Sequence, residues 1–495
     1  MSSSPSRLVS SSLLAISLAT AAYSSPLSTS PYNLPTERSP FAKAPLVETE
    51  HYHGTVNGSY IISLRDDISP SMMESHFNFL EATHQDRFFV AENGCSGVKH
   101  KYETVNAYSG CFHPETIELI RQSPLVEHVE LDQVVRTTEI IDQNGAPWGL
   151  ARLSHRKRLT FGTFRKYLFD EDGGEGVTAY VIDTGVAIDH PEFEGRATWG
   201  KTIPQNDVDE DANGHGTHCA GTIGSKSYGV AKKAEIVAVK VLGSNGSGTM
   251  SDVISGVDFA AKEAKAKAEA AEQELRTTGQ TKHRGSVANM SLGGGKSPTL
   301  DRAVNAAAVG GLHFAVAAGN ENQDACKSSP AASENALTLG ASTVGDERAY
   351  FSNWGTCVDI FGPGLNIMST WPGNATNTIS GTSMASPHAC GLMAYLLSIY
   401  GHPTFPEVAT AEDFIDFSVQ RTFSIYALAH ASLPSFVSRF LPSPSFFEAA
   451  VAPVPKKPLS FSQLKEIIIS LSTKDALTDV GSGSPNKLLY NNVTA

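Results

Sequence analysis

The chain has 495 residues, which is more than one ordinary domain, so we expect at least two folded parts. Hydrophobic residues make up 41% of it and glycine occurs 42 times, a composition that favours a compact α/β protein and excludes a disordered one. The formal net charge of −13 argues against nucleic acid as a partner, because surfaces that bind nucleic acid are basic.

The beginning of the chain is typical of a secretory signal. Arg7 supplies a positive start, residues 8–18 form an apolar core, and Ala19 to Ala21 offer small residues for cleavage. We therefore predict a signal peptide over 1–21, with a frayed amphipathic terminus as the alternative. No later apolar run reaches the roughly 18 residues that cross a bilayer, so we expect no membrane span.

A Ser- and Pro-rich linker is expected over 22–57, followed by a small domain over 58–138. Its patterns predict a strand, two helices and a closing strand at 60–64, 69–84, 116–124 and 125–135. This order favours an open-faced, ferredoxin-like α+β sandwich, in which helices cover one face of an antiparallel sheet.

From about residue 147, apolar strands alternate with helices. We expect strands at 176–183, 236–242, 286–294 and 312–320, and helices at 250–275 and 299–310. This alternation predicts a mostly parallel sheet covered on both faces, with functional groups at the carboxyl ends of its strands. Asp183 and Asn320 each end one of the expected strands.

Three glycine-flanked motifs carry a catalytic pattern. Asp183 lies in VIDTGV, His215 in NGHGTHCAGTIG and Ser383 in SGTSMASPHACG. A serine hydroxyl is a poor nucleophile at neutral pH, so it needs a base, and the base needs a group that orients it. We therefore expect Ser383 to be the nucleophile at a helix N-terminus, His215 the base and Asp183 the orienting carboxylate.

Each of these residues has an ordinary alternative when it is taken alone. Ser383 fits a helix N-cap. His215 and His218 could bind zinc, but Gly216 stands where the HExxH motif has glutamate. The D-T-G at Asp183 also occurs in aspartic proteases, which need a second such carboxylate, and the sequence has no second D-T-G or D-S-G.

Other residues are expected to complete this site. Asn320 in AAGNEN could supply one donor of an oxyanion hole, with the backbone N–H of Ser383 as the other. Two glycine-bearing segments could pair with an extended peptide as an added strand. Their candidate substrate-binding residues are Ser247, Gly248, Ser291, Leu292, Gly293 and Gly294.

The chain has six cysteines, which in a secretory context permit disulfides without dictating them. Cys326 and Cys357 flank one compact stretch and are the preferred pair, and Cys95 with Cys111 is a second candidate. Among the N-x-S/T sequons, Asn374 in an expected loop is the best candidate for glycosylation.

Assembled in this order, the motifs resemble the subtilisin-like serine proteases, in the proteinase K branch. The resemblance rests on HGTHCAGTIGSKSYGVAKK, ANMSLGGGKSP, HFAVAAGNENQDAC, YFSNWGTCVDIFGPG and SGTSMASPH. The match to the family pattern is dense over residues 147–400, covers 58–138 as an inhibitory propeptide and is looser over 459–490. It implies a catalytic domain over 139–402 that resumes at 458–495, and it does not predict the Phe-, Pro- and Ser-rich insert at 403–457.

The resemblance implies a three-layer α/β domain and a serine endopeptidase of broad specificity. Such an enzyme is made as a zymogen, cleaves proteins and peptides through an acyl-enzyme, and needs no cofactor for catalysis. Its own propeptide acts as an intramolecular inhibitor and is cut off near Thr138–Glu139. The resemblance also implies a monomer in the vacuolar lumen, with secretion as the alternative location.

Three details come from the resemblance alone. It implies the disulfide Cys326–Cys357 and a reduced Cys219 beneath His215, which makes the enzyme sensitive to mercurials. It also implies structural calcium, bound by the carboxylate of Asp359 together with nearby backbone carbonyls. The partner loop SSPAASENALT differs from the family pattern, which leaves calcium open.

Two other classes of protein remain as alternatives. An inactive binding or chaperone relative would normally have lost Asp183, His215, Asn320 or Ser383, and all are present. An esterase of α/β-hydrolase type needs G-x-S-x-G with its Asp and His after the serine, whereas both precede Ser383 here.

Overall fold

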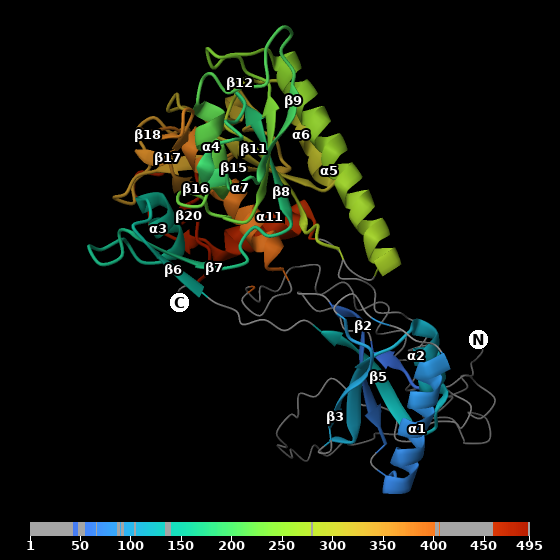
Figure 1. Ribbon diagram of the computed structural model, residues 1–495. Helices are drawn as coiled ribbons and strands as arrows, with labels where there is room; N and C mark the ends of the chain where they lie inside the picture. Colours follow the sequence, from blue (N-terminus) through green and yellow to red (C-terminus); the bar gives the residue numbers. More distant parts are fainter. Residues whose placement is uncertain are drawn as a thin grey trace, which may run out of the picture.

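The computed structural model describes two units with separate sheets and separate cores (Figure 1). The described residues are 43–47, 55–65, 67–86, 90, 94–102, 105–133, 140–278, 281–400, 405 and 459–493. The predicted signal peptide, the predicted cut at Thr138–Glu139, most of the linker and all of the insert except Phe405 lie outside these residues.

The N-terminal unit is an open-faced sandwich. Its sheet has the order β1-β5-β2-β4-β3, antiparallel except for the pair β1–β5. Helices α1 and α2 pack on it, and their Leu80 and Ile117 share a core with Ile62, Tyr108 and Val129 of the strands. The bounds are β1 Leu46–Val47, β2 Thr55–Leu64, α1 Pro70–Asp86, β3 Gly97–Tyr102, β4 Ala107–Cys111, α2 Pro114–Gln122 and β5 Val126–Gln133.

The α+β class of this unit is confirmed, but three of its strands were not predicted. The last four residues of the edge strand β3 are exposed, so its sequence GVKHKY shows no alternation of apolar and polar residues. Strand β4 is short and buried throughout, and therefore shows no alternation. Strand β1 lies in the expected linker and pairs in parallel with Val129 and Glu130 of β5.

The second unit is built on a nine-stranded sheet with the order β19-β20-β16-β15-β13-β11-β8-β10-β9. All neighbours are parallel except β19 and β20. Strands β8, β13 and β15 are buried along their whole length, because helices cover both faces of the sheet. The bounds are β8 Val177–Asp183, β9 Ala197–Thr202, β10 Glu235–Lys240, β11 Gly285–Met290, β13 Leu312–Ala317, β15 Ala336–Ser342, β16 Ile360–Pro363, β19 Thr473–Lys474 and β20 Lys487–Leu488.

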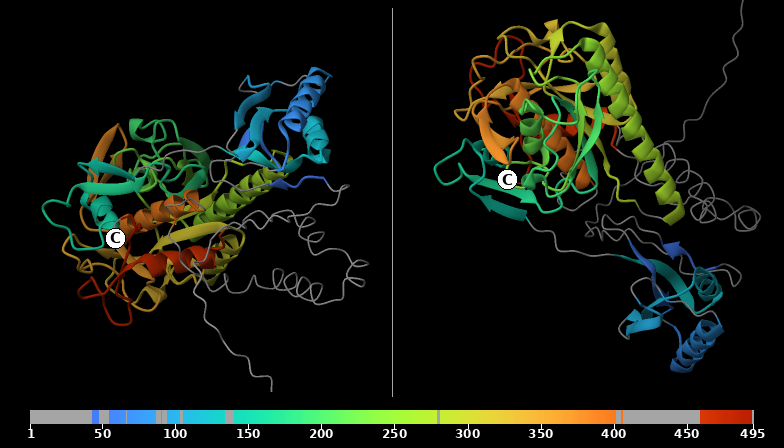
Figure 2. Two further views of the ribbon diagram at one scale, coloured as in Figure 1. Left: turned by 90° about the horizontal axis from the view of Figure 1, so that it is seen from below. Right: turned by 45° about the horizontal axis from the view of Figure 1, so that its top comes forward.

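The helices complete three layers, which confirms the predicted three-layer α/β class. Helices α4 (His215–Gly224) and α7 (Thr382–Ser398) pack together on one face, and α5 (Met250–Thr278) and α6 (Pro298–Val309) on the other. Figure 2 shows the long α5, in yellow-green, along one side of this unit. The remaining elements are β6 Ile140–Asn144, α3 Trp148–Ser154, β7 Lys166–Asp170, η2 Pro191–Phe193, β12 Gly294–Gly295, η3 Ala325–Lys327, β14 Ser328–Ser329, β17 Ile367–Trp371, β18 Ala375–Ile379 and α11 Phe461–Leu471.

Three expected strands end earlier than predicted, and the smallest difference is at β10, which stops at Lys240. Strand β11 stops at Met290, and Gly294–Gly295 instead form β12, which pairs antiparallel with β14. Strand β13 stops at Ala317, so Asn320 lies in the turn that follows it. After β11 and β13, the chain leaves the sheet in a turn that contains glycine, although the sequence there still resembles a continuation of the apolar strand.

The residues that follow the insert belong to the same unit. Helix α11 starts with a capping box between Ser460 and Gln463, which fixes where the helix begins. Its buried residues are Phe461, Leu464, Ile467, Ile468 and Leu471. Strand β20 then pairs with β16 of the main sheet. Across the described residues, no helix is both long and apolar enough to cross a membrane.

Candidate active site

Asp183 and His215 meet at the carboxyl edge of the sheet. Asp183 is the last residue of β8 and is fully buried, while His215 is the first residue of α4 and its side chain is 26% exposed. Nδ1 of His215 lies 2.7 Å from Oδ1 of Asp183. Because a carboxylate only accepts hydrogen bonds, Nδ1 carries the proton and Nε2 is left as the basic nitrogen.

A second carboxylate, Asp211, fixes the relative positions of these two elements. Its Oδ1 accepts from the hydroxyl of Thr184 at 2.8 Å and from the backbone of Gly214 at 2.8 Å. Its Oδ2 accepts from the backbone of Thr217 at 2.9 Å and from the Thr217 hydroxyl at 2.5 Å. Asp211 is 5% exposed and joins the residue after Asp183 to the first turn of α4. The sequence offers only one sign of this role, an Asp shortly before the HGTH motif.

The environment raises the pKa of His215. Burial lowers this pKa, but the charge of Asp183, its hydrogen bond and the charge of Asp211 together outweigh burial. The site therefore stabilises the imidazolium, which is the form that appears when the imidazole takes up a proton.

Ser383 stands in the first turn of α7, directly after Gly381 and Thr382. Its hydroxyl donates to the carbonyl of Ser291 at 3.1 Å, and the hydroxyl of Ser291 donates to the Ser383 carbonyl at 2.7 Å. These reciprocal bonds tie the N-terminus of α7 to the segment that leaves β11. Rotation about the Cα–Cβ bond of Ser383 can redirect its hydroxyl towards another acceptor.

Asn320 is oriented by Thr382. Its Oδ1 accepts from the backbone N–H of Thr382 at 2.8 Å and from the Thr382 hydroxyl at 2.9 Å, and that hydroxyl accepts from Gly319 at 3.1 Å. With Oδ1 held in this way, Nδ2 is the donor end of the amide. Thr382 was not among the predicted site residues.

Gly381 leaves a small space between two donors. A Cβ at this position would lie 3.5 Å from both Nδ2 of Asn320 and the backbone N of Ser383. It would also lie 3.6 Å from Cβ of Ser383. An amide N–H pair that converges beside the Ser383 side chain has the chemistry of an anion-binding hole.

The predicted substrate-binding residues lie on two neighbouring segments. Ser247 and Gly248 are exposed in the loop between β10 and α5, and Asn213 beside His215 donates to Ser244 of that loop at 2.9 Å. Gly293 and Gly294 are exposed after β11, with Leu292 half-buried before them. A Cβ at Gly294 would lie 3.3 Å from Cε of Met250, so the two segments adjoin.

A buried lysine, Lys240, also supports the site and was missed by sequence reasoning. It is the last residue of β10 and is fully buried. Its Nζ donates to the carbonyls of Thr184 at 3.0 Å and Glu210 at 3.1 Å, and lies 3.5 Å from Oδ2 of Asp207. The only signal for this role is a charged residue within the apolar run IVAVKVL.

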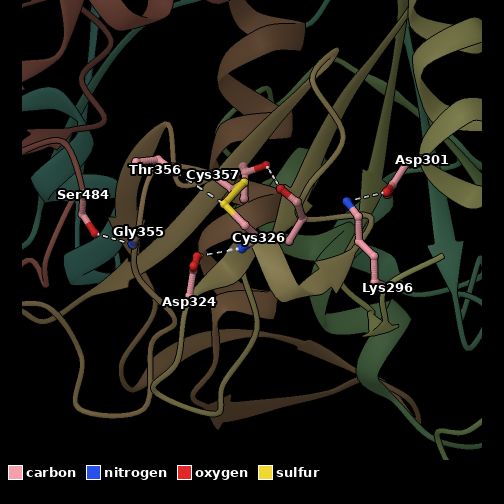
Figure 3. Close-up of a disulfide and its surroundings, with 10 residues drawn as sticks. Lys296, Asp301, Asp324, Cys326, Gly355, Thr356, Cys357 and Ser484 are labelled. Carbon is pink, nitrogen blue, oxygen red and sulfur yellow. Dashed lines mark hydrogen bonds and ion pairs between the residues drawn. A yellow bond between two sulfur atoms is a disulfide. The ribbon is translucent and has the colours of Figure 1, made fainter. Parts of the chain in front are cut away.

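Both expected disulfides are present. Cys95–Cys111 joins the segment before β3 to β4, and Cys326–Cys357 joins η3 to the segment before β16. Figure 3 shows the second pair, with the carboxylate of Asp324 accepting from the backbone of Cys326 at 3.0 Å.

The other two cysteines, Cys219 and Cys390, are free and buried. Sγ of Cys219 lies 3.4 Å from the carbonyl of Ser383, and ligand atoms of Asp183, His215 and Cys219 lie within 4.8 Å of one another. These three residues are a poor metal site, because burial raises the pKa of the Cys219 thiol and Nδ1 of His215 already bonds Asp183.

The oxygen atoms expected to bind calcium already contact a lysine ammonium. Oδ2 of Asp359 accepts from the Lys465 ammonium at 2.8 Å and from the backbone of Thr338 at 2.9 Å. The same ammonium donates to the carbonyl of Ala336, also at 2.8 Å. A lysine cation therefore holds the oxygens that a calcium ion would need.

The fold, the buried Asp183–His215 pair and the chain order Asp, His, Ser are typical of one class of serine protease. The chain belongs to the subtilase family, whose family model matches residues 174–422, and a model of the peptidase inhibitor I9 domain matches residues 59–138. It is therefore a subtilisin-like serine endopeptidase that is made as a zymogen, and it needs no cofactor for catalysis.

Similar proteins agree with this assignment. The chain is 48% identical to subtilisin-like protease 8 of Arthroderma otae over 454 residues, which cover 88% of this chain and 81% of the relative. It is 52% identical to cerevisin of Saccharomyces cerevisiae over 419 residues, which cover 82% of this chain and 58% of cerevisin. A crystal structure of a cold adapted subtilisin-like serine proteinase aligns with a TM-score of 0.53 at 38% identity, covering 71% of this chain and all of that one.

Proposed function

We propose that Ser383 is the nucleophile of this endopeptidase, His215 its general base and Asp183 the group that orients His215. The observation that carries the proposal is the 2.7 Å contact between Nδ1 of His215 and the buried carboxylate of Asp183. It leaves Nε2 to take the proton of the Ser383 hydroxyl as that oxygen attacks the scissile carbonyl. The hydroxyl must first leave the Ser291 carbonyl, and catalytic hydrogen bonds often form only once substrate is bound.

The space beside Gly381 would receive the oxyanion of the tetrahedral intermediate. Nδ2 of Asn320 and the backbone N–H of Ser383 are its donors. The imidazolium of His215 then protonates the leaving amine, and water releases the acyl-enzyme by the same steps. Loss of one donor of this kind typically costs on the order of 10²–10³ in turnover.

The substrate would bind as an extended strand between these two segments, along the exposed Gly293 and Gly294 on one side. Ser291 to Gly294 would form one wall and Ser247 with Gly248 the other, with backbone groups pairing with the peptide. Backbone pairing ignores side chains, which is why we propose broad specificity in protein degradation. The glycines leave room for a bulky apolar side chain next to the scissile bond.

The N-terminal unit would inhibit the enzyme until the enzyme cuts the chain near Thr138–Glu139. The match of an inhibitor domain to residues 59–138 supports this processing step. We further propose that the mature enzyme is a monomer in the vacuolar lumen, on the strength of its similarity to cerevisin. Asn374, exposed in the turn between β17 and β18, is the proposed glycan site.

Replacement of Ser383 tests the proposal. Wild-type protein should hydrolyse casein and shed its N-terminal unit without help, whereas Ser383→Ala should do neither and should still unfold cooperatively on heating. Ser380→Ala, an exposed serine on the same segment, is the control and should keep casein hydrolysis. Self-processing and casein hydrolysis by Ser383→Ala at the wild-type rate would refute the assignment.

A further inference from the structure

Lys465 of α11 places its ammonium among oxygen atoms from two other segments. Its Nζ lies 2.8 Å from Oδ2 of Asp359 and donates to the carbonyls of Ala336 at 2.8 Å and Glu334 at 3.5 Å. The two carbonyls belong to segment 328–338, which includes the start of β15 and is the segment whose sequence departs from the family pattern. The carboxylate lies just before β16, so one cation joins α11, this segment and the main sheet.

This set of oxygens is one that a calcium ion prefers. Calcium binds carboxylates and backbone carbonyls, and the resemblance implies calcium at Asp359 with carbonyls nearby. The contacts here have the length of N–H···O hydrogen bonds, whereas Ca²⁺–O distances are about 2.3–2.6 Å. A lysine ammonium has only donors and a positive charge, so it suits the same oxygens.

We propose that Lys465 is a built-in cation that takes the place of a structural calcium ion at Asp359. Segment 328–338 and the carboxylate are then held together by the chain itself, whatever the calcium concentration around the protein. The ammonium of Lys240 has a similar environment, with two carbonyls and one carboxylate around it.

The fold fixes Lys465 in this position. Helix α11 is anchored by its capping box and by apolar residues in the main core. At its start, the ring of Phe461 stacks on His313 of β13, with centroids 6.1 Å apart. The ammonium lies 5.8 Å from the centroid of that same Phe461 ring, close enough for a cation–π contact. The packing of α11 therefore places the Lys465 ammonium at this site, so no ion from solution is needed there.

The experiment measures the melting temperature of the full chain in EDTA and in millimolar calcium. All variants carry Ser383→Ala, which removes self-digestion from the measurement. Lys465→Met removes the ammonium but keeps an apolar stem, and Asp359→Asn removes the carboxylate charge. Lys474→Met is the matched control, because Lys474 lines the groove beside Lys465 and is exposed.

We expect the parent protein and Lys474→Met to melt at the same temperature in EDTA and in calcium. Lys465→Met should melt lower in EDTA, by about 2–6 °C, and should recover in calcium. Adding Asp359→Asn to Lys465→Met should abolish that recovery, which separates this site from any other calcium site on the protein.

Three results would overturn the proposal. One is that calcium raises the melting temperature of the parent protein and that Asp359→Asn abolishes this rise. Another is Lys465→Met with the parent melting temperature in EDTA. The third is a destabilised Lys465→Met that calcium does not restore, because the two cations would then not share one site. Should Lys465→Met fail to fold, calcium titration of the parent and of Asp359→Asn by calorimetry still decides, since heat of binding that depends on Asp359 contradicts the proposal.

Discussion

Thr382 holds the side-chain amide of Asn320 through two hydrogen bonds to the same oxygen, at 2.8 Å from its backbone and 2.9 Å from its hydroxyl. The residue directly before the proposed nucleophile thus sets the direction of the proposed oxyanion donor. The first turn of α7 therefore couples the orientation of the Asn320 side chain to the position of Ser383.

Replacing the Thr382 hydroxyl should therefore slow turnover without weakening substrate binding. Thr382→Val keeps the shape and the backbone N–H but removes the bonds of the hydroxyl to Asn320 and Gly319. We expect kcat to fall about tenfold while KM stays nearly unchanged. The loss should be smaller than for Asn320→Ala, where we expect kcat to fall by roughly 10²–10³. Steady-state kinetics on a peptide amide measure both, and Thr382→Ser should restore kcat. A rise in KM at constant kcat would contradict this role.

A methyl group at position 381 should block the same space. The backbone of Gly381 has a φ of 163°, which is extended and open to any residue, so Gly381→Ala should fold normally. Its Cβ would stand 3.5 Å from both donors and compete with the oxyanion. We expect kcat to fall by roughly 10²–10³ while the melting temperature changes little. Wild-type turnover by Gly381→Ala would show that the oxyanion binds elsewhere.

Removal of the Asp211 charge should shift the pH profile towards acid. Asp211 helps to raise the pKa of His215, and the reaction needs His215 neutral in the free enzyme. Asp211→Asn therefore lowers this pKa, and the acid limb of the kcat/KM profile moves to lower pH.

Asp209→Asn, an exposed carboxylate nearby that bonds Thr202, is the control and should leave the limb in place. Asp211→Asn should also lower the melting temperature, because its amide cannot accept all the bonds that the carboxylate does. An acid limb that stays in place, or moves to higher pH, would contradict the electrostatic role of Asp211.

Mercurials should inhibit the enzyme through Cys219. Its Sγ lies 3.4 Å from the Ser383 carbonyl, so a metal atom on the sulfur would displace α7. Burial raises the pKa of this thiol, so we expect slow inhibition and little reaction with iodoacetamide. Residual activity after mercurial treatment measures this: Cys219→Ala should resist, and Cys390→Ala should be inhibited like wild type. The reverse pattern would place the sensitive thiol at Cys390.

Much of the fold was predictable, because β8, β10 and β13 are apolar runs between helices and turns. The end of β11 was not, since SLGGG continues its pattern while the chain actually turns to pair with Ser328 and Ser329. Asp183, His215, Asn320 and Ser383 could be chosen because each stands in a short motif of its own.

The supporting residues could not be chosen in the same way. Lys240 and Asp211 act largely through backbone atoms of distant segments, so a lone charged residue in each stretch was too weak a signal to assign a role. Lys465 meets the carbonyl of Ala336, 129 positions away in the chain, and only the packing of α11 brings the two together.

The most direct test of the central claim is covalent labelling with a phosphonylating inhibitor, followed by peptide mapping of the modified residue. The account predicts one phosphonyl group per mature enzyme, on Ser383, and at least a hundredfold slower labelling in His215→Ala from which added wild-type enzyme has removed the N-terminal unit, because the hydroxyl then lacks its base. Labelling at another serine, or an unchanged rate in His215→Ala, would contradict it.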